Sequence, residues 1–126
     1  MPLTTIAGDI IADALIGGVT YPRLTPANAH IGVGDGTTAF AAGQTDLQGT
    51  NKVRRAMNTG YPTRTANSIT LQATFGTEDA NFDWNEWGVF NSSSGGNMFC
   101  RKVESLGTKT NSATWQLSVT LTFNVS

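Results

Sequence analysis

The sequence is poor in the residues that most often carry chemistry. Its 126 residues include a single cysteine, Cys100, and a single histidine, His30. One cysteine permits no internal disulfide, and one histidine without partners supports neither a metal site nor a catalytic triad. We therefore expect Cys100 to be a small buried hydrophobe and His30 to have a structural role. These scarcities argue against an enzyme and against a bound cofactor or metal.

Charge is also scarce. Asp, Glu, Lys and Arg make up 13% of the chain, about half the ordinary share, and the formal net charge is −1. A nucleic-acid binder would show a basic face, whereas the densest basic group here, Lys52, Arg54 and Arg55, would be divided between the two faces of a strand. We interpret that group as a solvated edge. No apolar run approaches the roughly 20 residues of a membrane helix, and the start lacks the pattern of a signal peptide. The sequence thus predicts a protein made in the cytoplasm that binds neither nucleic acid nor membrane.

The most informative pattern that is present lies at residues 115–126, where apolar and polar residues alternate without interruption. A period of two predicts a β-strand with one buried face. The inward set is Trp115, Leu117, Val119, Leu121, Phe123 and Val125. The outward set is uncharged, and we expect it to contact another protein surface, chiefly through Gln116, Ser118, Thr120 and Thr122.

Further strands are predicted at residues 28–34, 51–58, 69–75, 82–90 and 98–105, separated by segments rich in Gly, Asn, Ser and Thr. Residues 37–49 read as a surface loop and residues 91–97 as a hairpin loop. The apolar phase changes between Trp84 and Trp87, which predicts a β-bulge near residues 85–86. We expect Trp87 and Trp115 in the core, whereas the pattern supports burial of Trp84 least. The predicted fold class is mainly β, an antiparallel β-sandwich with one short N-terminal helix.

That helix is predicted over residues 4–16, where apolar residues recur at helical spacing. Thr4 or Thr5 would cap its start, and glycines 17 and 18 would end it. Two prolines make the following segment extended. We expect residues 1–28 to form a helix and arm that dock on a neighbouring subunit, and residues 29–126 to form the sandwich of the same single domain. The candidate docking residues on the helix are Ile6, Ile10 and Leu15.

Two groups of residues suggest a binding site, but we interpret both as structural features of the fold. Gly32, Gly34 and Gly36 superficially resemble a phosphate loop, yet they satisfy neither GxGxxG nor GxxxxGK[ST]. The densest acidic group could supply oxygen ligands to calcium, but it has no established calcium-binding spacing and reads as a solvated loop. Its members are Glu78, Asp79, Asp83 and Glu86.

Three segments resemble a family of small virion proteins of tailed bacteriophages. They are residues 29–39 (AHIGVGDGTTA), residues 84–91 (WNEWGVFN), and residues 101–103 (RKV) followed by 107–110 (GTKT). The family typically carries an IGTGTTAP…TDTAL stretch and an E-W/I-G-L-F-N/D stretch, and the second also resembles a motif of phage tail-collar fibre domains. This chain departs from the pattern at Phe40, where proline is commoner, and at Val89, where leucine is commoner.

The second stretch is the candidate fold motif, which we expect to form a strand after the bulge. Gly88 would give room to a neighbouring backbone or ring, and Glu86 would be available to pair with Arg54 or Arg101. The motif consists of Glu86, Trp87, Gly88, Val89 and Phe90.

The resemblance implies a non-enzymatic structural component of a tailed-phage virion that binds other virion proteins. Because the chain shows no shaft or tip domain beside its sandwich, we expect a capsid decoration, or cement, protein that bridges subunits of the major capsid protein. A tail, collar or tail-fibre accessory protein is the alternative, and a carbohydrate-binding module using Trp84 and nearby loops is a third. The sparsely charged surface also predicts a homo-oligomer, either a trimer or a dimer.

Overall fold

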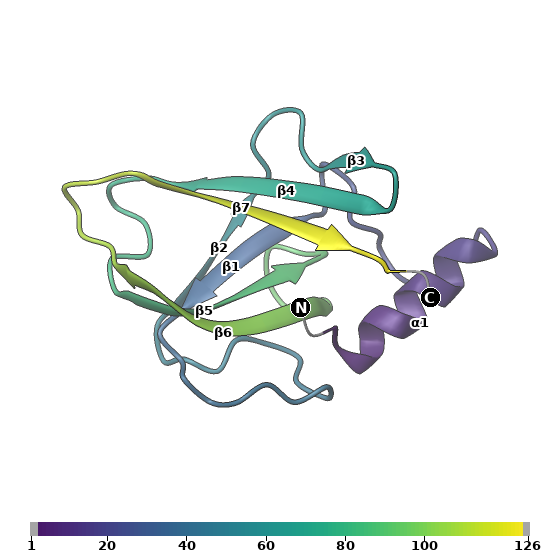
Figure 1. The fold of residues 1–126 in the computed structure, drawn as a ribbon, viewed down its shortest axis with the longest axis horizontal. Coiled ribbons are helices and arrows are strands. Elements are labelled where there is room, and N and C mark those ends of the chain that lie inside the picture. The colour runs from purple at the N-terminus through teal and green to yellow at the C-terminus, as the bar shows by residue number, and fades with distance from the viewer. Residues whose placement is uncertain (1–2, 125–126) are drawn as a thin grey trace.

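The computed structural model describes residues 3–124, and within them the chain forms one α-helix and seven β-strands (Figure 1). The helix α1 spans Thr5–Leu15. The strands are β1 His30–Gly34, β2 Lys52–Ala56, β3 Thr63–Thr65, β4 Ser68–Phe75, β5 Asp83–Phe90, β6 Met98–Thr108 and β7 Trp115–Thr122. None of the helical structure in the described range is long and apolar enough to cross a membrane.

The strands form two antiparallel sheets, which confirms the predicted fold class. One sheet has the order β2-β1-β5-β6 and the other the order β3-β4-β7. Figure 1 shows the sheets stacked as a sandwich that opens toward the end where α1 lies. The edge strands β6 and β7 lie on the same side of the sandwich, where residues of both line one groove.

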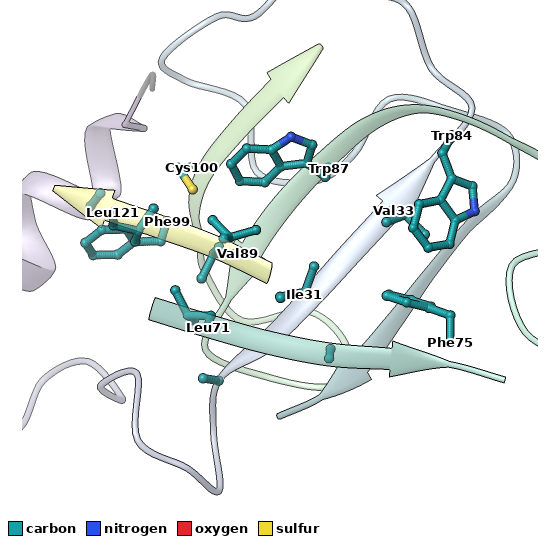
Figure 2. Packing of buried hydrophobic residues seen from close by; sticks show 14 of the residues in the cluster. Ile31, Val33, Leu71, Phe75, Trp84, Trp87, Val89, Phe99, Cys100 and Leu121 are labelled. Atoms are coloured by element: carbon teal, nitrogen blue, oxygen red, sulfur yellow. The ribbon is translucent and has the colours of Figure 1, made fainter. Parts of the chain in front are cut away.

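The core between the sheets contains predicted inward residues of both alternating strands, with Leu71, Ala73 and Phe75 from β4 and Val119 and Leu121 from β7 (Figure 2). Trp115, Leu117 and Phe123 of the predicted inward set are only partly buried against it.

Trp84 also belongs to the core, although its burial had the weakest sequence support, and the side chain is only 2% exposed. Its ring packs edge-on against Phe75 and Trp115, with centroids 4.9 and 5.0 Å apart. The indole Nε1 donates to the carbonyl oxygen of Ala80 at 2.9 Å, so burial leaves no polar atom of Trp84 unpaired. A binding module that relies on an exposed Trp84 therefore has no support.

A register irregularity lies where the bulge was predicted, but its extra residues belong to β6 and not to the motif strand β5, because residue 85 lies opposite residues 104–106. The pairing register between β5 and β6 shifts between Trp84 and Glu86, where the apolar phase changes. As a result Trp84 and Trp87 both point into the core, although they lie three positions apart.

Helix α1 begins and ends where its capping residues predicted. The Thr4 Oγ1 accepts a hydrogen bond from the Ala7 backbone at 3.3 Å, so Thr4 rather than Thr5 is the N-cap. At the other end Gly17 has a φ of +71°, and the amide of Gly18 donates to the Asp13 carbonyl at 2.8 Å. This left-handed glycine ends the helix in a Schellman motif.

Several boundaries differ from those expected, and the short strand β3 was not predicted. Strand β6 continues to Thr108 instead of ending at residue 105, because it stays paired with β5 beyond the bulge. Strand β7 ends at Thr122, and the last two residues of the predicted strand, Val125 and Ser126, lie outside the described residues. The segment 35–51 is a loop, but it covers the outer face of the four-stranded sheet, where Leu47 is only 3% exposed.

Candidate functional site

A fully buried ion pair joins the two long strands of the four-stranded sheet. The side chains of Glu86 on β5 and Arg101 on β6 are both 0% exposed, and the Arg101 Nε donates to the Glu86 Oε1 at 2.7 Å. Burying two charges costs several kcal/mol per ion, roughly, unless the geometry is good and the remaining polar atoms are also paired. The environment of this pair must therefore satisfy every polar atom.

The loop of residues 35–51, which we call the covering loop, provides those partners. Glu86 Oε2 accepts from the backbone amides of Gly36 and Gly49 at 2.9 and 2.7 Å, and Oε1 accepts from the amide of Gln48 at 2.9 Å. Arg101 donates through Nη2 to the Thr38 carbonyl at 2.8 Å and through Nη1 to Gln44 Oε1 at 3.1 Å. In the part of the chain that the structure describes, every buried side-chain nitrogen or oxygen has a partner. We call this network of Glu86, Arg101 and their loop partners (Gly36, Thr38, Gln44, Gln48 and Gly49) the Glu86 centre.

The glycines that resemble a phosphate loop make room for this centre. A Cβ on Gly34 would lie 2.6 Å from Glu86 Oε2, and a Cβ on Gly36 would collide with the same oxygen and lie 2.5 Å from the amide nitrogen of Gly49. At Gly32 it would lie 2.7 Å from the ring of Phe90. The space above these glycines is filled by the protein itself, so they offer no phosphate site.

Gly88 allows the close approach that was expected of it. The sheet register places Arg54, Gly32, Gly88 and Arg101 in one row across the four strands. A Cβ on Gly88 would lie 2.9 Å from the carbonyl oxygen of Cys100 and 3.2 Å from the Leu47 side chain. The two central glycines therefore keep the row flat, and Leu47 packs over it.

Arg54, the other candidate partner of Glu86, has a different role. Its guanidinium lies 3.6 Å from the centroid of the Phe90 ring, in cation–π geometry. It also donates to the carbonyl oxygens of Ser92 and Gly95 at 3.0 and 2.9 Å. Arg54 thus holds the 91–97 loop against the sheet, and Arg101 alone pairs with Glu86.

Among the remaining charges of the two candidate groups, Lys52, Arg55 and Asp79 form ion pairs, and the side chains of Lys52 and Arg55 stay exposed to solvent, as expected of a solvated edge. Lys52 Nζ contacts Asp46 at 2.8 Å, and Arg55 contacts Asp79. The hydrogen bond from Arg55 lowers the pKa of Asp79 below its usual value. Among residues 3–124, no three His, Cys, Asp or Glu side chains come close enough together to hold a metal ion.

Sequence reasoning missed one buried charge, Lys109, which it placed in a connecting segment. Its side chain is 1% exposed, and Nζ donates to the carbonyl of Gly76 at 2.6 Å and to Asn81 Oδ1 at 2.8 Å. Its partners lie 28 and 33 positions away, so no local pattern marks this lysine as buried.

The outward residues of the three-stranded sheet form a continuous uncharged surface. Neighbouring side chains bond to one another across the strands, as in the pairs Ser68–Thr122 at 2.9 Å and Gln72–Ser118 at 3.1 Å. We call this surface the polar face, and the sheet register assigns to it Thr63, Thr65, Ser68, Thr70, Gln72, Thr74, Gln116, Ser118, Thr120 and Thr122. The structure thus brings the four candidate interface residues of β7 together on one side of the molecule.

The candidate interface residues of α1 do not share a surface. Ile10 is 6% exposed and belongs to the core, and Ile6 packs against the core. Leu15 is 82% exposed and lies at the free end of the helix with Ile16 and Val19, which are also exposed. The reason is the opening of the sandwich toward α1, which draws one stripe of the helix into the core. Of the three, only Leu15 is available to a partner.

The remaining candidate residues, His30 and Cys100, are buried. His30 Nδ1 lies 2.8 Å from the carbonyl oxygen of Asn28. Burial raises the pKa of the Cys100 thiol to about 12. The thiol is therefore protonated at neutral pH and lacks the reactivity of a thiolate.

We expect Cys100 to resist a thiol reagent such as 5,5′-dithiobis(2-nitrobenzoic acid) at pH 8 for as long as the protein is folded. In guanidinium chloride one thiol per chain should react within minutes, because unfolding removes both the burial and the raised pKa. The measurement is the absorbance of the released thionitrobenzoate. Rapid reaction of the native protein would contradict the buried position of this residue.

Comparison of the chain with family models, with curated proteins and with solved structures yields no match. No relative therefore assigns a role to the Glu86 centre or to the polar face. The two sites differ in their access to solvent. The Glu86 and Arg101 side chains are buried, whereas most of the polar face is exposed.

Proposed function

We propose that this chain is a non-enzymatic structural protein of a tailed-phage virion, a capsid decoration protein that bridges neighbouring capsid subunits. The observation that carries the proposal is the polar face, a broad sheet surface without a single charged side chain. The virion context comes from the three sequence segments that resemble phage virion proteins.

An uncharged face suits burial against another protein. Removing charges from water is costly, and this surface has none to remove. Its hydroxyl and amide groups already form hydrogen bonds with one another across the strands, as Thr70 and Thr120 do at 3.3 Å. A partner that covers them therefore leaves few polar atoms without a hydrogen bond. Asn58 extends the network by donating to Gln72 at 3.0 Å and accepting from Thr74 at 3.0 Å.

The motif residues that carry the resemblance support a structural role. Glu86 makes four hydrogen bonds through its two oxygens and has no contact with solvent, so it has no free position for a substrate proton. Trp87 and Val89 are core residues, and Phe90 packs with Leu47 and Met98 under the covering loop. The motif thus builds the fold and leaves function to the surfaces.

The proposal is tested by an isosteric charge on the polar face, Gln72→Glu. The new carboxylate can still accept from Asn58, and its second oxygen can accept from the Ser118 hydroxyl, to which the Gln72 amide donates in the wild type. The domain should therefore fold, but a partner would have to desolvate an unpaired charge. We expect its affinity for particles that lack this protein to fall at least about tenfold. The measurement is the occupancy of the particles as a function of added protein.

The matched control is Asn111→Asp, the same chemical change in an exposed turn away from the polar face. It should bind particles as the wild type does. Equal binding of wild type and Gln72→Glu would show that the polar face is merely solvated, and the proposal in this form would be lost.

A further inference from the structure

The two sheets present four edge strands, and their protection differs. An edge strand exposes a row of unpaired backbone groups, which other strands can join unless charges, prolines, bulges, shortness or a covering segment prevent it. The edges here are β2 and β6 in one sheet and β3 and β7 in the other.

Three of these edges carry recognised protection. Strand β2 contains Lys52, Arg54 and Arg55, and β3 has only three residues, one of them Arg64. Strand β6 carries exposed Lys102, has two register irregularities with β5, and is covered at its start by a bridge between Leu3 and Cys100.

Among the residues that the structure describes, nothing gives strand β7 such protection. Its eight residues, WQLSVTLT, include no charge and no proline, and its register with β4 is continuous. The amide of Phe123 donates to the carbonyl of Asn67 at 2.9 Å, and antiparallel strands alternate between bonded and non-bonded pairs. The backbone groups that point away from β4 are therefore those of Gln116, Ser118, Thr120 and Thr122. No hydrogen bond from residues 3–124 reaches them.

We propose that β7 pairs antiparallel with β7 of a second copy about a two-fold axis at Val119. The two three-stranded sheets then become one sheet of six strands. This register brings all the outward-pointing backbone groups into bonded pairs, with Ser118 opposite Thr120 of the second copy and Gln116 opposite Thr122 of the second copy. Shifting it by one residue on each strand leaves part of the row unpaired.

Charge identifies a second copy as the partner. Self-pairing of β2 would bring lysine and arginine side chains close to their own kind, which is unfavourable, whereas β7 has no charge to repel itself. The cross-strand bonds between β4 and β7 also show that Ser, Thr and Gln fit opposite one another on this face.

The groove beside this edge adds an apolar contribution. It has a volume of about 420 Å³, and its lining combines the apolar side chains of Trp87, Leu106 and Leu117 with the charged Lys102 and Glu104 of β6. Leu117 is only half-buried, although it belongs to the inward set of β7. In the paired sheet it lies opposite Leu121 of the second copy, which removes apolar surface from water.

The experiment measures the sedimentation of the purified chain at tens of micromolar, where we expect a dimer. Ser118→Pro removes an amide that points to the free edge and makes no bond to β4, so it should raise the dimer dissociation constant at least about a hundredfold while the domain stays folded. The control is Arg64→Pro, which removes an outward amide from the opposite edge of the same sheet and should leave the dimer intact.

A charge-swap pair tests the register without proline. The double variants Ser118→Lys/Thr120→Lys and Ser118→Glu/Thr120→Glu should each be monomeric, because like charges face each other across the axis. Mixing the two should restore a dimer. A monomeric wild type, or a dimer that survives Ser118→Pro and both charge variants, would overturn the inference. The inference is independent of the virion role, since a monomer that still binds capsids would leave the proposed function standing.

Discussion

Glu86→Ala is expected to destabilise the domain by about 3–5 kcal/mol, a large part of the roughly 5–15 kcal/mol that holds a typical domain together. The change leaves the Arg101 guanidinium buried without its counter-charge. It also removes the hydrogen-bond acceptor of the backbone amides of Gly36, Gln48 and Gly49. The measurement is urea unfolding followed by tryptophan fluorescence. The covering loop should also become sensitive to proteolysis, since the Glu86 centre binds it to the sheet.

Two further variants show whether this loss comes from the ion pair. Glu86→Leu/Arg101→Met removes both charges. Its loss of unfolding free energy should be smaller than the sum of the losses of the two single variants, because each single variant leaves one unpaired buried charge and the double variant leaves none. Lys102→Ala removes a neighbouring lysine whose ion pair with Glu104 is exposed, and should change stability by less than about 1 kcal/mol. Near-wild-type stability of Glu86→Ala would contradict a structural role for the centre.

Leu71→Asp is expected to unfold the protein, because it places an unpaired carboxylate between the two sheets. Leu71 is 0% exposed on the central strand β4, and the cost is roughly several kcal/mol. The next residue along the strand points outward, so Gln72→Glu should retain a melting temperature within a few degrees of the wild type. Circular dichroism melts compare the two. Equal stability of these neighbours would contradict the assignment of the two faces of β4.

The sequence was sufficient wherever the determinant was local. Period-two alternation predicted the faces of β4 and β7, and Thr4 and Gly17 set the ends of α1. The change of apolar phase after Trp84 located the register irregularity between β5 and β6, although the pattern did not show that the extra residues belong to β6.

What could not be predicted depends on contacts between distant segments. Glu86 had two arginine candidates, and only the strand order and the path of the covering loop decide that Arg101 is its partner. Lys109 reads as a loop lysine, and its burial follows from the position of Gly76 and Asn81. Ile10 belongs to the core because the sandwich opens toward α1, a property of how the sheets diverge and not of the helix sequence.

The most direct test of the structural role is electron microscopy of purified virions, from a host carrying the gene, labelled with gold-conjugated antibody to this chain. We expect gold over the surface of the head, at many sites per particle. Label confined to the tail would contradict the capsid placement, and virions without any label would contradict the virion role itself.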